Sequence, residues 1–266
     1  MINLDRLKRV SLQLLFVVSV PVSIAVTIHY NLWLWFICGF VYSRIAVTLV
    51  SIQIGLHRYF AHGQFRTGKL RHIFLCCMSI IGGEGDPLAW SKTHVHHHKY
   101  SDQPKDIHSP TVDGWLHSSL GFIFKPTRWF LEKHIQITTS GVVRLTKDPL
   151  VMFINKNYFY IWYMLIAVSF LISWKVCLFF VLMPAGIAIL NTGILSGTIL
   201  HMKFPGSYRN YDTPDNSHNN RWILAWNLGE GLHNNHHKFP FDYDTAKKPG
   251  EFDLTAWVIK KWFKIN

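Results

Sequence analysis

Apolar residues fall in two long blocks, Val10 to Leu56 and Tyr158 to Leu200, separated by polar and histidine-rich sequence. A bilayer core of about 30 Å needs only about 20 helical residues, so each block is too long for a single crossing. We therefore predict two helical hairpins. Polar residues interrupt the blocks near Asn31 and Lys175, and the four predicted transmembrane spans are 10–28, 32–56, 158–172 and 176–200.

Charge places these spans relative to the membrane. Nearly all Lys and Arg lie outside the two short turns, which contain only Lys175, and the positive-inside tendency makes the polar segments cytoplasmic. We expect an all-α, multi-pass integral membrane protein with both termini in the cytoplasm. The segments 57–157 and 201–266 should form a helical cytoplasmic cap within a single domain, 1–266. The first span should be retained, because no small-residue cleavage site follows it.

Composition narrows the partners. The chain is 49% hydrophobic with a net charge of +12, which suits a lipid bilayer and an anionic substrate carrier. Nucleic acid is not an expected partner, because the basic residues flank apolar spans and no recognition motif accompanies them. The four cysteines lie in apolar stretches, so they are interpreted as buried thiols rather than disulfides or zinc ligands.

Sixteen histidines are an unusually large number, and most of them cluster. On a helix, residues at i, i+3 and i+4 share a face, and two triplets have this spacing. A pair follows the second span and a single histidine follows the fourth, so the hairpin topology should bring both to one membrane interface. The nine candidate metal ligands are His57, His62, His94, His97, His98, His201, His233, His236 and His237.

Imidazole is a common ligand for transition metals, and nine nitrogens suit two ions, each with four or five ligands and an open position. His57 and His62 are five residues apart, about 140° on a regular helix, so the second span should end or unwind between them. His96 should point away from His94. The isolated His29, His72, His134 and His218 are interpreted as ordinary surface or core residues.

The histidine groups and their surroundings resemble the membrane fatty acid desaturases, in particular the branch of stearoyl-CoA and bacterial acyl-CoA desaturases. The similar segments are GLHRYFAHGQF, GDPLAW, HVHHHKYSDQPKDIHSP, YRNYDTPDNSHNN, GEGLHNNHHKFP and EFD. The resemblance implies that the same nine histidines hold two iron ions. Three positions depart from the family pattern: Gly197 replaces a usual asparagine, Ser119 a frequent histidine and Ile107 a usual proline.

The resemblance implies an O2-dependent di-iron desaturase that introduces a double bond into a fatty acyl chain carried as a thioester of coenzyme A or acyl carrier protein. Breaking an unactivated C–H bond requires a cofactor that activates oxygen. Electrons should come from a separate protein of ferredoxin, rubredoxin or cytochrome b5 type. The sequence shows neither a cytochrome-like segment nor a set of cysteine ligands for an iron–sulfur cluster. A bacterial inner membrane is preferred over the endoplasmic reticulum.

Other functions remain compatible with the histidine spacing. Hydroxylation or acetylenation of an acyl chain would use the same scaffold. A non-enzymatic metal transporter or haem-binding membrane protein is disfavoured, because a transporter places its ligands inside the spans at mid-depth.

Carboxylates beside the histidines provide the next candidates. Asp102, Asp106 and Glu230 could accept the free ring N–H of a liganding histidine and fix its orientation. Solvated loop charges are the alternative, above all for Asp102.

The helix that leads into His57 is the predicted wall of an acyl tunnel. Four candidate wall residues share one helical face, namely Val41, Ile45, Leu49 and Gln53, and Arg44 lies next to Ile45 in sequence. Ile45 and Arg44 would close the tunnel early and favour a short or medium chain. In the alternative, Arg44 pairs elsewhere, since a charge within a span is costly and needs a partner.

Overall fold

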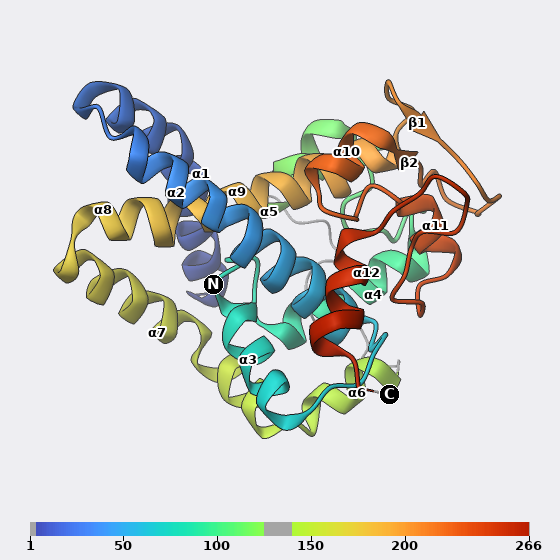
Figure 1. Ribbon diagram of the computed structural model, residues 1–266, viewed down its shortest axis with the longest axis horizontal. Coiled ribbons are helices and arrows are strands. Elements are labelled where there is room, and N and C mark those ends of the chain that lie inside the picture. Colours follow the sequence, from blue (N-terminus) through green and yellow to red (C-terminus); the bar gives the residue numbers. More distant parts are fainter. Residues whose placement is uncertain (1–3, 125–139, 266) are drawn as a thin grey trace.

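The computed structural model describes residues 4–124 and 140–265, and the chain is mostly helical (Figure 1). The first hairpin consists of α1 (Leu4–Tyr30) and α2 (Trp33–Tyr42), and α2 continues into the π-helix η1 (Ser43–Ala61). The turn contains Asn31 at φ 55°, a left-handed conformation that asparagine tolerates better than most residues. The predicted break near Asn31 is confirmed.

The second hairpin turns at Ser173. Helix α7 (Pro149–Ile172) ends there, and Ser173 adopts an extended conformation in which its side chain accepts the N–H of Lys175. The chain continues through α8 (Trp174–Val176), η4 (Cys177–Leu182), α9 (Met183–Leu190) and η5 (Asn191–Ser196). This break also lies where the polar residues predict it.

Three helices of the described chain are long and apolar enough to cross a membrane, at Asp5–Tyr30, Trp33–Ala61 and Trp174–His201. Their outer faces, and that of α7, expose apolar side chains such as Leu34 at 74% and Leu171 at 84%. Extended apolar surfaces of this kind are unfavourable in water and favourable in lipid. The structure is thus that of a membrane protein, with three of the four predicted spans meeting these criteria.

The two hairpins pack through a close contact between α1 and α9. A Cβ atom placed on Gly186 would lie 2.1 Å from the backbone oxygen of Phe16, so only glycine permits this approach. The Phe16 ring in turn lies 4.5 Å from that of Trp162 on α7. The contact ties α1, α7 and α9 together beneath the cap.

The cap gathers on one side of the molecule, away from the two hairpin turns (Figure 1). Its α4 begins at Asp86, whose carboxylate accepts the N–H groups of Leu88 and Ala89, as an N-cap should. Two short strands pair antiparallel, with Ser207 opposite Asn220. The cap elements are α3 (Lys69–Ile80), α4 (Pro87–Tyr100), η2 (His117–Gly121), α5 (Phe122–Phe124), α6 (Ser140–Thr146), η6 (Ile199–His201), β1 (Ser207–Tyr208), β2 (Asn219–Asn220), α10 (Arg221–Trp226), α11 (His233–Lys238), α12 (Leu254–Val258) and η7 (Ile259–Phe263).

Candidate metal centre

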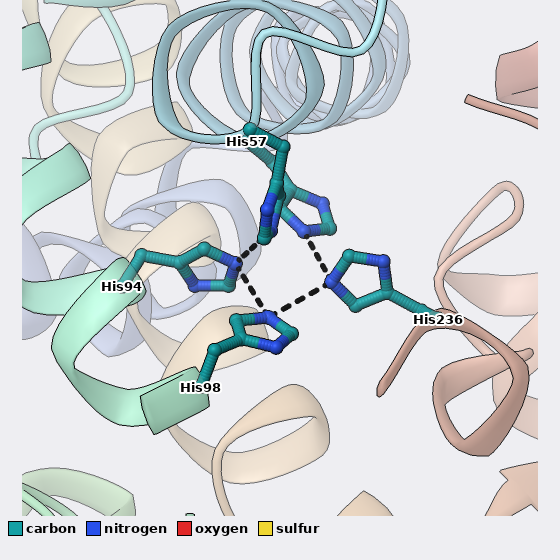
Figure 2. Close-up of side chains that lie close together, drawn as sticks. His57, His94, His98 and His236 are labelled. Atoms are coloured by element: carbon teal, nitrogen blue, oxygen red, sulfur yellow. Dashed lines mark hydrogen bonds between the residues drawn. The ribbon is translucent and has the colours of Figure 1, made fainter. Parts of the chain in front are cut away.

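The nine candidate histidines converge into two groups inside the cap. The five-histidine group contains His57, His62, His94, His98 and His236, and the four-histidine group contains His97, His201, His233 and His237. Within each group the potential ligand atoms lie within 4.8 Å of one another. In Figure 2 the labelled rings of His57, His94, His98 and His236, which come from three separate segments of the chain, point toward a common centre.

Local helix geometry explains how each segment contributes. On α4, i, i+4 spacing directs His94 and His98 into the five-histidine group, while His97 faces the other group. On α11 the division is reversed, because His236 joins the five-histidine group and the i, i+4 pair His233 and His237 joins the four. The two helices therefore each serve both groups.

The prediction that the second span ends or unwinds between His57 and His62 is confirmed in part, because η1 ends one residue before His62 and is a wider π-helix. The π-helix continues to Ala61, and the N–H of His62 donates to the carbonyl of His57 over 3.1 Å. An i→i+5 hydrogen bond places residues five apart above one another. The wider turn therefore brings both rings to one face, at a site where π-geometry commonly occurs.

The ring contacts within the groups cannot all be hydrogen bonds. In the five-histidine group the Nε2 atoms form a chain of contacts of 2.8–3.1 Å in the order His62, His94, His98, His236 and His57. A neutral Nε2 either donates one hydrogen or accepts one, so at most two of these four contacts can be satisfied. In the four-histidine group, His233 Nε2 lies 3.0 Å from that of His201 and 3.1 Å from that of His237, with the same conflict.

A metal ion at each centre resolves that conflict. A transition-metal–imidazole bond is about 2.1 Å long, and two such bonds at right angles separate their nitrogens by about 3.0 Å. The observed Nε2 separations match this spacing. Imidazole nitrogen suits iron, zinc, copper and nickel alike, so the donor set fits a transition metal without specifying which one.

Carboxylates contact the outer ring nitrogen, Nδ1, of four of these histidines, and the three predicted carboxylates account for three of the contacts. Asp106 lies 2.9 Å from Nδ1 of His97, and Asp102 lies 2.9 Å from Nδ1 of His201. Glu230 accepts from Nδ1 of His57 at 3.1 Å. A proton on Nδ1 leaves the Nε2 lone pair free to face the centre. The structure therefore puts all three predicted carboxylates where they can orient a histidine.

Asp215 also orients a histidine ring, although the sequence pattern did not predict this role. Its carboxylate lies 2.7 Å from Nδ1 of His237 and is further held by Thr213 and Ser217. It lies within the segment YDTPDNS, which carried part of the family resemblance, but the nearest histidine in sequence, His218, is not a candidate ligand. With Asp102, Asp106 and Glu230 it supplies four negative charges, which would balance two divalent cations.

Electrostatics keeps most of the rings neutral. Burial lowers the pKa of His94, His98, His233 and His236 well below the ordinary value, and burial lowers that of His237 to about 4. His97 differs: burial acts to lower its pKa, but Asp106 raises it above the ordinary value. Burial opposes ionisation of Asp102, yet its hydrogen bond with His201 lowers its pKa to about 2. Neutral imidazoles beside ionised carboxylates are the protonation states that metal binding requires.

Four of the other histidines, His29, His72, His96 and His218, lie apart from the two groups. His96 donates toward the carbonyl of Lys105 over 2.9 Å, outside both groups as predicted. His72 contacts Tyr59 and Asp148, and His218 contacts the backbone of Asn216. His29 packs on the ring of Tyr30. His134 lies outside the described residues.

Two of the three departures from the family pattern, Gly197 and Ile107, line a cavity that reaches the two groups. A Cβ on Gly197 would lie 3.4 Å from Nδ1 of His108, whose ring stacks on that of His97. Ser119 is buried and contacts the hydroxyl of Thr198 at 3.1 Å. Ile107 is also buried. None of them displaces a candidate ligand.

One cavity reaches both histidine groups. Its wall includes His57, His94, His97 and His233, together with apolar side chains such as Ile52 and Ile189. Such a cavity, apolar with a few convergent polar groups, is typical of a small-molecule site.

The predicted tunnel wall requires correction. Of its five residues only Gln53 lines this cavity. Val41 and Ile45 are 48% and 57% exposed on the outer surface, and Leu49 packs into the core. The prediction placed residues four apart on one face, which assumes a regular α-helix. The chain forms wider π-turns from Ser43 onward, and these rotate the predicted face away from the histidine groups.

Arg44 also lies outside the cavity wall. Its guanidinium donates to the backbone oxygen of Trp226 and to Thr48, and it stacks 4.9 Å from the Trp226 ring. The alternative interpretation, in which Arg44 pairs elsewhere, is therefore the one that the structure supports.

Comparison with known proteins agrees with the sequence motifs. The profile of the fatty acid desaturase family matches residues 29–246. The chain is 28% identical over 236 residues to the icosanoyl-CoA 5-desaturase of Limnanthes douglasii, covering 87% of this chain and 63% of that protein. It is 30% identical over 239 residues to an acyl-CoA desaturase of Cyprinus carpio, covering 84% of this chain and 68% of the relative.

A third relative carries a different activity. The hex-5-enoyl-[acyl-carrier protein] acetylenase of Moorena producens is 27% identical over 249 residues, covering 84% of this chain and 74% of that protein. The chain thus spans about two thirds of the length of the curated relatives it matches.

Proposed function

Because this chain belongs to the fatty acid desaturase family, we propose that it is an O2-dependent di-iron desaturase that introduces a double bond into a fatty acyl chain carried as a thioester. The observation that carries the proposal is the pair of imidazole groups at the wall of one cavity. Their Nε2 spacing suits metal ligation, and the cavity would bring an acyl chain beside both groups.

The two groups would each hold one iron, through five and four imidazoles. When bound, the iron pair would supply the oxidising power that side chains lack for an unactivated C–H bond. Asp102, Asp106, Asp215 and Glu230 hold protons on Nδ1 of their histidines and keep the Nε2 lone pairs directed inward. Nine imidazoles shared between two metal ions would leave each ion able to take a further ligand.

The cavity would position the substrate and exclude water. Trp90 stacks 4.7 Å from the ring of His94 at an angle of 21°, so it fixes both that ring and one wall of the cavity. Ile52, Ile189 and Ile123 supply apolar surface around it. Holding adjacent methylene groups in such a dry site is what selective removal of two hydrogens requires.

We place four spans in the membrane, with α7 as the third. Its exposed apolar side chains, including Phe170 and Leu171, continue the lipid-compatible surface of the other helices. Both termini and the cap would lie in the cytoplasm, because the basic residues concentrate there. A bacterial inner membrane is the preferred location.

The proposed partners are an acyl thioester, O2 and a separate electron-transfer protein of ferredoxin, rubredoxin or cytochrome b5 type. The names of these relatives include both coenzyme A and acyl carrier protein. The net charge of +12 suits either anionic carrier.

The test is a reconstitution in detergent or lipid with ferrous iron, a chemical reductant and O2. Acyl thioesters of several lengths on both carriers would be offered, and the products identified by mass. Loss of two hydrogens supports desaturation. Loss of four hydrogens would identify an acetylenase, and gain of one oxygen a hydroxylase. No product from any thioester, in protein shown to contain two irons, would reject the proposal.

A further inference from the structure

Two polar side chains line the cavity beside the five-histidine group. Gln53 lies on η1 four residues before His57, and Glu84 lies in the loop before α4. The oxygen Oε1 of Gln53 and the oxygen Oε1 of Glu84 are both buried without a hydrogen-bond partner among the described residues. We call these two residues the polar pair.

The second oxygen of Glu84 is fixed. The indole N–H of Trp90 donates to Oε2 over 2.8 Å, and Trp90 stacks on His94. The carboxyl group is thus held in place, with the Thr192 side chain beside it and with Oε1 lacking a well-aligned hydrogen bond. Burial raises the pKa of Glu84 to about 7, so the neutral acid is populated near neutral pH and can donate as well as accept a hydrogen bond.

Buried polar atoms without partners are rare, and they commonly mark a place where a ligand or water completes the bonding. A plain methylene chain in this cavity would cover both oxygens and leave them unpaired. A carboxylate on the chain would be repelled by the ionised form of Glu84, and an ammonium by the metal ions proposed next to it. A hydroxyl group is small, donates one hydrogen and accepts another, so it can bond to either member of the polar pair.

We propose that the polar pair, Gln53 and Glu84, binds a hydroxyl group on the acyl chain, so that the preferred substrate is a hydroxyl-bearing acyl thioester. This inference rests on the proposed function. It assigns the substrate class from this chain's own residues. A site that hydrogen-bonds a substrate hydroxyl discriminates strongly against the analogue without it, because its own polar groups are then unpaired.

The experiment compares the iron-loaded wild-type protein on matched thioesters: a plain chain, a series with one hydroxyl at successive carbons, and the corresponding methyl ethers. The ethers accept but cannot donate a hydrogen bond. At one position in the series, kcat/KM for the hydroxyl chain should exceed that for the plain chain by about 100-fold. The ether at that position should lose most of this preference.

Three variants connect the preference to the polar pair. Gln53→Leu and Glu84→Leu should each lower the hydroxyl-to-plain ratio at least tenfold, on the order of one lost hydrogen bond. Glu84→Gln is the matched control, because it keeps a neutral donor, an acceptor and the bond to Trp90, and should retain the preference. Iron content of each variant reports whether the cap has folded. If the variants lower kcat/KM for the hydroxyl and plain substrates by the same factor, the polar pair only supports Trp90 and η1, and the inference fails.

The outcomes separate the inference from the proposed function. Plain chains converted as fast as every hydroxyl chain would overturn the inference and leave desaturation standing. If no thioester is oxidised, the proposed function fails. In that case the inference is tested by binding, measured as the rise in thermal midpoint that each thioester causes. A rise with the hydroxyl thioester but not with the plain one supports the inference, and equal rises overturn it.

Discussion

The carboxylate of Asp215 accepts a hydrogen bond from Nδ1 of His237 over 2.7 Å. Asp215 is 22 residues away in sequence, and Thr213 and Ser217 hold its other lone pairs. The ring of His237 is therefore fixed from outside, with its Nε2 atom directed at the four-histidine group. Outer partners of this kind commonly change metal affinity by about 10- to 100-fold.

Replacing Asp215 with asparagine should weaken metal binding at the four-histidine group by about 10- to 100-fold. The amide keeps the shape but loses the negative charge that stabilises the ring N–H. Metal titration of the purified variant should show one site of native affinity and one weakened site. Asp212→Asn is the control, because Asp212 is nearby and exposed. Two sites of native affinity in the Asp215 variant would contradict the role assigned to this carboxylate.

The spacing of histidines along the chain predicted the two histidine groups, because helix periodicity decides which rings share a face. The two triplets needed only i, i+3, i+4 periodicity, and the hairpins needed only apolar length. The sequence could not reveal Asp215, since tertiary folding alone brings it to His237. It also could not reveal the π-turns of η1, which place His62 over His57 and rotate Val41 and Ile45 to the outer surface. Periodic patterns assume one helix type, and this site departs from it.

The metal-free protein should lose stability as the pH falls from 7 to 5. Buried histidines such as His94 and His98 have folded-state pKa values well below the ordinary value, whereas in the unfolded chain they titrate near about 6.5. The unfolded state binds more protons, so their contribution is complete above about pH 6.5 and decreases below it. His97, whose pKa is raised, and Glu84, whose pKa is raised to about 7, oppose this trend as two groups.

Several histidines titrate in this window, so the loss should exceed about 1.4 kcal/mol per pH unit. Asp102, with a pKa of about 2, stays ionised throughout and should not contribute. Thermal midpoints at pH 7 and pH 5, with and without added ferrous iron, provide the measurement. Bound metal should shift the decline to lower pH. A midpoint independent of pH in the metal-free protein would show that the rings are not buried as neutral imidazoles.

The contact between α1 and α9 should tolerate no side chain at Gly186. A Cβ there meets the backbone of Phe16 at 2.1 Å, so Gly186→Ala must separate the two helices. We expect a loss of about 1–3 kcal/mol, seen as a lower thermal midpoint in detergent. Gly68→Ala is the matched control, because nothing lies within 4 Å of its Cβ position and its φ is negative. Equal midpoints for both variants would contradict the close approach.

Arg44 should matter for stability and not for chain length. Its guanidinium joins the second span to Trp226 at the end of α10, and it does not line the cavity. Arg44→Ala should therefore lower the thermal midpoint. Arg44→Lys should recover only part of it, because an ammonium cannot reproduce the planar stacking and paired donors. The acyl chain-length profile should stay that of the wild type, and a shift toward longer chains would restore the idea that Arg44 closes the tunnel.

His96 and His98 offer the sharpest comparison within one helix. Both lie in the run HVHHH on α4. His98 Nε2 faces His94 and His236 at 3.1 and 2.9 Å. His96 Nε2 instead lies 2.9 Å from the carbonyl oxygen of Lys105, and its ring packs on that of Tyr100. His98→Ala should remove one ligand from the five-histidine group, reduce iron below two per chain and abolish conversion of the thioester. His96→Ala should retain two irons and near wild-type turnover, because no metal contact is lost. Iron analysis and product mass on the same preparations test both statements. If the His98 variant keeps full iron and activity, or the His96 variant loses them, the division of the rings into two metal-binding groups is wrong.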